Sequence, residues 1–369
     1  MKKERNKCIL CDNTLYNILE FKLPCFMGVV KEASHTEDFK LSLTQCQECG
    51  EIQTKELFDV NIVYQNNHNI NTVGSIWENH YIEFARFIKN DIINKSILEI
   101  SDPSAKIAKL STEFASWDII EPNPENIKIE NVKFTRGFFD ENFKTQKKDI
   151  IIHSHLLEHM HDPISFLKQC HDILKDDGIM VFSIPDMDFL LNAGYSPGNI
   201  LHFEHTYFIN KDVVHYIAKK TGFEVSEFFF YKNHSVFFKL KKITPTNENI
   251  KPIKLELGNK FTNNFTHHLS NIKDINKITN VSTDEIYLFG AHVSSQFYIS
   301  NGLDTSKITT IIDNAPSKSG KFLFGTELRV EQPEILTNKK CTIICSHVGV
   351  YFDEIVSKLR SINQTINII

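Results

Sequence analysis

The chain has 369 residues, of which 41% are hydrophobic and 24% charged, the composition of a globular protein. This length exceeds what one hydrophobic core usually serves, so we expect two or three domains. A formal net charge of −5 argues against a nucleic-acid-binding protein. Because no apolar run could span a bilayer and the first residues do not resemble a signal peptide, we expect a cytoplasmic protein with reduced cysteines.

Two Cys-x-x-Cys pairs stand near the start of the chain, Cys8 with Cys11 and Cys46 with Cys49. Four thiolates from two such pairs make a tetrahedral site that suits structural zinc. We expect the short polar segment between the pairs to depend on the metal because it cannot form a full core. A redox role fits less well, since neither pair opens a helix after a strand. The sequence therefore predicts a zinc-binding module and loop over residues 1–75.

Short apolar runs separated by helix-like segments follow, a pattern typical of buried parallel strands. We expect a first helix at 76–88, because its apolar residues recur at helical spacing. Asp162 and Pro163 have the residue types of an N-cap and a first helical position. The predicted strands cover 96–100, 117–122, 148–153, 179–184, 224–230 and 235–240, the last two as an antiparallel edge hairpin, with helices at 163–174 and 211–221. Together they predict a Rossmann-like α/β domain over residues 76–242.

The last third of the chain repeats the α/β pattern after a polar linker at 243–254. It predicts a helix at 259–272, strands at 285–290, 308–313 and 341–346, and a helix at 352–359. We expect a smaller Rossmann-like domain over residues 255–369. The predicted fold class is therefore α/β throughout, apart from the small N-terminal module.

A candidate nucleotide site lies where the first two central strands end. Ligands of such sheets bind beyond the carboxyl ends of the strands, where Glu99 and Glu121 stand. The spacing suits one β-α-β step, with Glu121 placed to accept hydrogen bonds from ribose hydroxyls. The intervening turn carries Ser101, Asp102 and Pro103 where such turns use glycine. Two interpretations of this turn remain open. It is either an adenosyl-cofactor loop without glycine or a plain strand-to-helix turn.

The run from His155 to His159 has the form H-x-x-E-H, which is also a metallopeptidase pattern. A new helix begins three residues later, so the helix that this zinc site needs would be too short. Two alternatives remain, a structural role for both histidines or a role in lining a cofactor and substrate site at the strand end.

A second polar run, from His202 to Phe208, contains the pair Glu204 and His205. A carboxylate beside a histidine raises its pKa, which gives a base suited to proton abstraction near neutral pH. The alternative is a surface loop with a buried aromatic residue.

Taken together, these motifs resemble the three-domain sugar C-methyltransferases, over nearly the whole chain. The four cysteines match the family's zinc domain, and residues 149–163 are similar to its strand-four motif. Residues 204–208 are similar to its Glu-His-x-x-Tyr-Phe signature, shortened by one residue. The run 313–321, followed by Gly325 and Thr326, resembles its C-terminal signature. The chain departs from the family at the turn beginning with Ser101, at His202, and at Asn67, His68 and Asn69 near Tyr64, where the family has glycines or tyrosines.

The resemblance implies an S-adenosylmethionine-dependent methyltransferase with structural zinc. Its cofactor would lie at Glu99, Ser101, Asp102, Glu121 and His155. The resemblance also implies that His205, supported by Glu204 and with His159 nearby, removes a proton next to a sugar ketone, and the enolate then takes the methyl group. The substrate would be a nucleotide-linked or glycan sugar of surface-polysaccharide or deoxysugar biosynthesis, with carbon favoured over nitrogen or oxygen as acceptor. The alternative is a scaffold protein of a glycan pathway that no longer transfers methyl groups.

Overall fold

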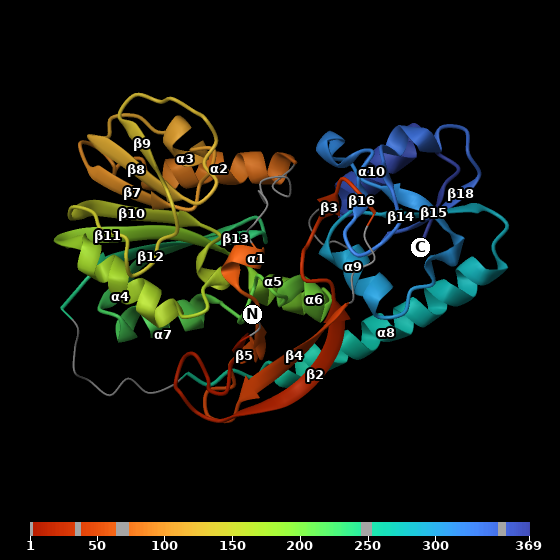
Figure 1. Cartoon of the computed structure of the whole chain (residues 1–369), viewed down its shortest axis with the longest axis horizontal. Coiled ribbons are helices and arrows are strands. Elements are labelled where there is room, and N and C mark those ends of the chain that lie inside the picture. Colours follow the sequence, from red (N-terminus) through yellow and green to blue (C-terminus); the bar gives the residue numbers. More distant parts are fainter. Residues whose placement is uncertain (1–2, 34–37, 64–73, 245–252, 346–351) are drawn as a thin grey trace.

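The computed structural model describes residues 3–33, 38–63, 74–244, 253–345 and 352–369. Figure 1 shows two α/β lobes side by side, with a long N-terminal hairpin and helix α8 running below them. Within the described ranges, no helix is both long and apolar enough to cross a membrane.

The N-terminal module is a small antiparallel sheet in the order β2-β4-β5, joined by two short strand pairs. Leu41 and Leu43 on β4 are fully buried and belong to one hydrophobic cluster with Phe182 of the first lobe and Phe297 of the second. Our expectation that this segment relies on metal for want of a core was therefore incomplete. Its elements are β1 (Lys3–Glu4), β2 (Leu15–Leu23), β3 (Val29–Val30), β4 (Phe39–Cys46), β5 (Ile52–Thr54), β6 (Glu56–Leu57) and α1 (Val60–Val63).

The first lobe has a mixed sheet whose described strands stand in the order β12-β13-β11-β10-β7-β8-β9. The neighbouring strands β11, β10, β7, β8 and β9 are parallel to one another. The hairpin of β12 and β13 forms the edge and pairs antiparallel with β11, which confirms the predicted arrangement. Strand β9 was not predicted because its sequence is only partly apolar. The strands are β7 (Ser96–Ile100), β8 (Ser116–Glu121), β9 (Val132–Arg136), β10 (Lys148–Ser154), β11 (Leu174–Pro185), β12 (Phe223–Tyr231) and β13 (Ser235–Lys242).

Helices cover both faces of this sheet, α2 and α3 on one and α4 and α7 on the other (Figure 1). Neighbouring residues of β10 alternate between the two layers, since Ile150 belongs to the same hydrophobic cluster as Phe84 of α2 and Ile151 to that of Leu167 of α4. Asp162 caps α4 as predicted, accepting a 2.9 Å hydrogen bond from the amide of Ser165. The helices are α2 (Ser75–Ile88), α3 (Lys106–Lys109), the 3₁₀ turn η2 (Leu157–His159), α4 (Pro163–Ile173), α5 (Met187–Asn192), α6 (Pro197–Ile200) and α7 (Lys211–Lys220).

The second lobe has a parallel sheet with the described order β17-β15-β14-β18-β19, as expected of a smaller Rossmann-like unit. The helix predicted at 259–272 continues to Val281, and Thr279 in its last turns is buried. The elements are α8 (Gly258–Val281), β14 (Glu285–Phe289), α9 (Val293–Ser300), η3 (Thr305–Lys307), β15 (Ile308–Ile312), η4 (Pro316–Lys318), β16 (Phe322–Leu323), β17 (Val330–Glu331), η5 (Pro333–Leu336), β18 (Cys341–Ile344), α10 (Phe352–Ile362) and β19 (Asn367–Ile368).

The N-terminal module joins the second lobe by backbone pairing and aromatic packing. Strand β3 pairs antiparallel with β16, which lies about 290 positions later in the chain. Phe21 of β2 packs edge-on against Phe297 of α9, with ring centroids 5.4 Å apart. Gly198 of α6 brings the first lobe against the same ring, since a Cβ at this position would lie 2.6 Å from it. These contacts fix how the two lobes face each other.

Candidate active site

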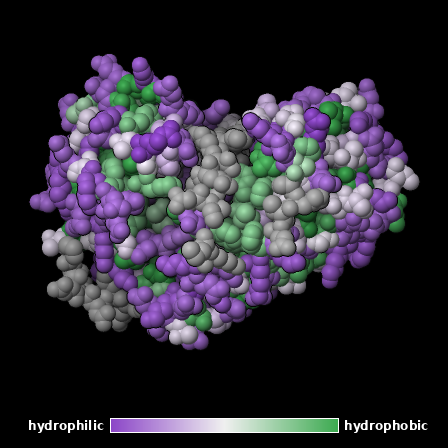
Figure 2. Space-filling view, in the orientation of Figure 1, coloured by the Kyte–Doolittle hydropathy of each residue, from purple (hydrophilic) through white to green (hydrophobic). Residues whose placement is uncertain are grey.

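A cavity of about 1080 Å³ lies between the carboxyl ends of the central strands and the second lobe. Its first wall contains Ser101 and Glu121, and its opposite wall contains His292 and Asn314. Figure 2 shows hydrophilic residues over most of this face and hydrophobic residues gathered between the two lobes. The position agrees with the rule that ligands bind beyond the carboxyl ends of parallel strands.

Glu121, Ser101 and His155 line the part of the cavity beside the sheet. Glu121 is 6% exposed and accepts a 2.8 Å hydrogen bond from the amide of Asn123, while burial raises the pKa of its carboxyl group. Ser101 has φ 67°, the left-handed conformation that favours glycine. The turn therefore keeps a glycine-like backbone even though its sequence contains no glycine.

Glu99 and Asp102 lie behind this wall and are not among the residues that line the cavity. Glu99 is 1% exposed and accepts a 2.7 Å hydrogen bond from Nε1 of Trp117. Asp102 accepts hydrogen bonds from the amides of Ser104 at 3.0 Å and Lys106 at 2.5 Å, which secures the start of α3. We expected both side chains to contact the cofactor, but their partners are residues of the turn and the neighbouring strand.

At the other end of the cavity, His159, His202, Glu204 and His205 form a compact polar wall. The rings of His202 and His205 are stacked with centroids 4.4 Å apart, and His159 meets His205 edge-on at 4.8 Å. Glu158 lies behind them with no exposed surface, and one ligand atom each of Glu158, His159 and His205 lie within 4.8 Å of one another. Sequence reasoning missed Glu158, although it is the carboxylate of the H-x-x-E-H run.

The electrostatics of this wall correct our expectation for His205. Burial lowers the pKa of His205, and the nearby Glu158 carboxylate only partly opposes this effect. Burial also raises the pKa of Glu158 to about 7, with His205 acting in the opposite direction. Our expectation that Glu204 raises the pKa of His205 was therefore wrong, because this pKa is lowered. The carboxylate that acts on the ring is that of Glu158. At neutral pH the imidazole is uncharged and can accept a proton.

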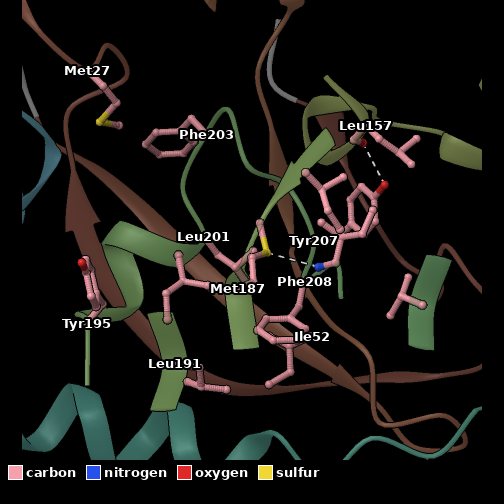
Figure 3. Packing of buried hydrophobic residues seen from close by; sticks show 14 of the residues in the cluster. Met27, Ile52, Leu157, Met187, Leu191, Tyr195, Leu201, Phe203, Tyr207 and Phe208 are labelled. Atoms are coloured by element: carbon pink, nitrogen blue, oxygen red, sulfur yellow. Dashed lines mark hydrogen bonds between the residues drawn. The ribbon is translucent and has the colours of Figure 1, made fainter. Parts of the chain in front are cut away.

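The segment that carries His205 is held by contacts from three parts of the chain. The hydroxyl of Tyr207 donates a 2.8 Å hydrogen bond to the carbonyl oxygen of Leu157, and the amide of Ile209 lies 3.2 Å from Sδ of Met187 (Figure 3). The guanidinium of Arg5 donates to the carbonyl oxygens of Thr206 at 2.6 Å and His161 at 2.8 Å. The N-terminal module therefore helps to position the polar wall of His159, His202, Glu204 and His205, which we call the histidine wall.

The H-x-x-E-H run does not form the helix of a metallopeptidase. His155 precedes η2, which has three residues, and only His159 lies within it. The two histidines therefore do not share a helical face, which the peptidase alternative requires.

The second lobe contributes a buried ion pair to the cavity wall. Nζ of Lys318 lies 3.1 Å from Oδ2 of Asp313 and donates to the carbonyl oxygen of Ala291 at 3.1 Å. Although burial alone would raise the pKa of Asp313, the charge of Lys318 keeps it below its usual value. This pair ties the signature run 313–321 to the turn after β14.

The loop residues Tyr64, Asn67, His68 and Asn69 lie outside the described residues.

The four cysteines come together as the sequence predicts. Sγ of Cys8 lies 3.6 Å from that of Cys49, and Sγ of Cys11 lies 3.5 Å from that of Cys46. A zinc ion bound at about 2.3 Å by four thiolates has sulfur-to-sulfur edges of about 3.8 Å, so the cluster fits such an ion. The distances are too long for disulfides.

Comparison with known proteins finds similarities to the first lobe. Residues 89–227 match the family of methyltransferase domains. Among solved structures, the chain resembles the N-methyltransferase NodS from Bradyrhizobium japonicum, with 12% identity and TM-score 0.37, covering 46% of this chain and 97% of that chain. It also resembles the magnesium protoporphyrin IX methyltransferase from Synechocystis bound to S-adenosylmethionine, with 10% identity and TM-score 0.36, covering 47% of this chain and 88% of that chain. No curated protein matches the chain by sequence.

Residues 89–227 of the first lobe thus match a methyltransferase domain, and the lobe has the Rossmann-like sheet expected of such a domain. The cavity lies at the edge of the sheet where this class of domain binds ligands.

Proposed function

We propose that the protein transfers a methyl group from S-adenosylmethionine to a nucleotide-linked or glycan sugar, with carbon as the favoured acceptor atom. The observation that carries this proposal is that one cavity joins the Glu121 wall to the half-buried, uncharged imidazole of His205. A ligand spanning the cavity would meet, at one end, the Glu121 carboxylate, which can accept hydrogen bonds from a ribose. At the other end it would meet the imidazole of His205, which can accept a proton. The volume of about 1080 Å³ suffices for a cofactor and a sugar together.

The chain's own residues have separate tasks in this proposal. The carboxylate of Glu121 accepts hydrogen bonds from the cofactor's ribose, while Ser101 and His155 line the space for its methionine part. The cofactor supplies an electrophilic methyl group when bound. His205 removes a proton from the carbon next to a sugar ketone, and Glu158 stabilises the imidazolium that forms. His159 and Glu204 orient the sugar, and the second lobe closes the opposite side of the cavity.

The same proposal includes one structural zinc ion held by Cys8, Cys11, Cys46 and Cys49. Its support is that the four sulfur atoms all lie within 4.8 Å of one another, two pairs of them at 3.5 and 3.6 Å. The ion would cross-link the ends of the N-terminal sheet and so help to hold Arg5 against the histidine wall.

Calorimetry with S-adenosylmethionine and S-adenosylhomocysteine tests the proposal. We expect both to bind the full chain, and Glu121→Gln to weaken binding by roughly 10- to 100-fold because a charged hydrogen-bond acceptor contributes roughly 1.5–3 kcal/mol. Glu130→Gln is the matched control, since Glu130 is an exposed glutamate of the same lobe. Absence of binding at millimolar ligand, in protein shown to be folded, would contradict the proposal and favour the scaffold alternative.

A further inference from the structure

Three histidines outside the proposed catalytic wall converge on one point beside the cavity, and one of them, His155, also borders the proposed cofactor space. His80 comes from α2, His155 follows β10, and His234 lies in the turn between β12 and β13. One ring nitrogen of each lies within 4.8 Å of the other two. The sequence places these residues far apart, so only the fold brings them together.

The nitrogens that converge all face the hydroxyl of Ser235. Nε2 of His155 lies 2.8 Å from Oγ of Ser235, while Nδ1 of His234 lies 2.6 Å and Nδ1 of His80 lies 3.1 Å from the same atom. Three imidazole nitrogens around one small polar atom form the donor set of a three-histidine metal centre.

The opposite nitrogens of two of these rings have partners of the kind that orient metal ligands. Nδ1 of His155 lies 3.3 Å from Oε1 of the buried Glu158, a close contact outside hydrogen-bond geometry. Nε2 of His80 lies 3.1 Å from Oγ of Ser154. Histidines that bind metals usually donate their second ring N–H to a carboxylate or another acceptor, which leaves the first nitrogen with its lone pair toward the ion. This arrangement selects the nitrogens that face Ser235 as ligands.

The surroundings keep the rings uncharged and leave one side open. Burial lowers the pKa of His155 and of His234 to about 3, and lowers that of His80 well below its usual value, so all three are neutral at pH 7. Trp77 packs edge-on against His155 at 4.8 Å and His234 at 4.5 Å. His155, His234 and Trp77 line the cavity, so an ion bound here would have a position open to water or a substrate oxygen.

We propose that His80, His155 and His234 bind a divalent transition-metal ion of the zinc or cobalt type, at a site distinct from the four cysteines. Imidazole nitrogens suit zinc, copper, iron and nickel, whereas calcium and magnesium prefer oxygen ligands. The proposal does not depend on the sugar substrate, because it rests on the ligand geometry alone.

The competing explanation is that Ser235 by itself satisfies the three rings. A hydroxyl can donate one hydrogen bond and accept two, which equals the number of its histidine partners. Ser235→Ala separates the two explanations, because it removes the hydroxyl and leaves all three possible ligands. A metal site retains its ion in this variant, whereas a hydrogen-bonded cluster has none to retain.

The experiment is a metal count on the full chain after equilibration with Zn²⁺ or Co²⁺ and removal of the excess. We expect two ions per chain in the wild type and in Ser235→Ala, but one ion in His234→Ala and in His155→Ala. The Co²⁺ spectrum should show the thiolate-to-metal band of the cysteine site in all four proteins, and d–d bands of a nitrogen site only in the first two. His267→Ala is the matched control, since His267 is exposed and distant in sequence.

Two results would overturn the inference. One is a wild-type chain that retains only the ion of the cysteine site. The other is a His234→Ala chain that retains both ions. If the histidine variants do not fold, anomalous scattering from Co²⁺-soaked crystals of the wild type decides the matter, with a peak among the three rings supporting the site and its absence contradicting it.

Discussion

At the scale of single residues, the chemistry of the cavity depends on which carboxylate acts on His205. Glu204 is its neighbour in sequence, but Glu158 is the buried carboxylate whose charge acts on the ring. Burial and this charge act in opposite directions on the pKa of His205, and burial dominates. The result is an uncharged base beside a carboxyl group whose ionised form can stabilise the protonated base.

Replacing His205 distinguishes a carbon acceptor from a nitrogen or oxygen acceptor. If carbon is methylated, His205→Ala should lower turnover by roughly 10²–10⁴-fold, the usual contribution of a general base. Substrate protons next to the carbonyl should also exchange with deuterium in the wild type without cofactor. A variant with nearly wild-type turnover and no exchange would instead favour a heteroatom acceptor, because an unprotonated amine needs mainly positioning. His215→Ala, in the exposed part of α7, serves as the control.

At the scale of the elements, the amino ends of the central strands are held by one carboxylate on β10. Asp149 accepts hydrogen bonds from the amide of Ser96 on β7 at 2.9 Å and from Lys175 on β11 at 2.8 Å. Burial alone would raise the pKa of Asp149, but these hydrogen bonds keep it well below its usual value. The strands that carry the cofactor wall are thereby joined at the end away from the cavity.

The stability that Asp149 contributes should depend on pH. Its folded pKa lies below the unfolded value of about 3.9, so the contribution is present above that pH and is lost as the pH falls through the folded pKa. At pH 7 we expect Asp149→Asn to lower the free energy of unfolding by about 1–3 kcal/mol, as for hydrogen bonds to charged groups. Urea unfolding at pH 7 and near pH 3.5 should show a smaller difference at the lower pH. Asp176→Asn, at a fully exposed carboxylate, is the control, and an equal difference at both pH values would contradict this account.

At the scale of the whole molecule, the N-terminal module acts as a brace between the lobes. Gln296 of α9 donates a 2.9 Å hydrogen bond to the carbonyl oxygen of Phe26, and Arg5 binds the loop before His205. A module that only stabilised itself would not contact both walls of the cavity. The division at residues 75, 242 and 255 stays a prediction, because one hydrophobic cluster spans all three parts.

Arg5 offers a test of this brace that leaves the four cysteines intact. Arg5→Ala removes the hydrogen bonds to Thr206 and His161, so we expect the histidine wall to shift and turnover to fall by about 10-fold or more. The cysteine-bound metal and the affinity for S-adenosylhomocysteine should change little. Lys7→Ala is the matched control, since Lys7 is an exposed cation of the same segment. Wild-type turnover in Arg5→Ala would show that the loop does not need the module.

The sequence by itself determined the α/β class, the order of the main strands and helices, and the four cysteines, because each follows from local periodicity, capping or spacing. The N-cap Asp162 and the edge hairpin belong to the same group. Tertiary structure alone decided that Glu158 acts on His205, that Glu99 faces Trp117, and that His80, His155 and His234 meet at Ser235. The physical reason is that burial and charge act between groups that are close in space, and closeness across strands and lobes is absent from the order of residues along the chain.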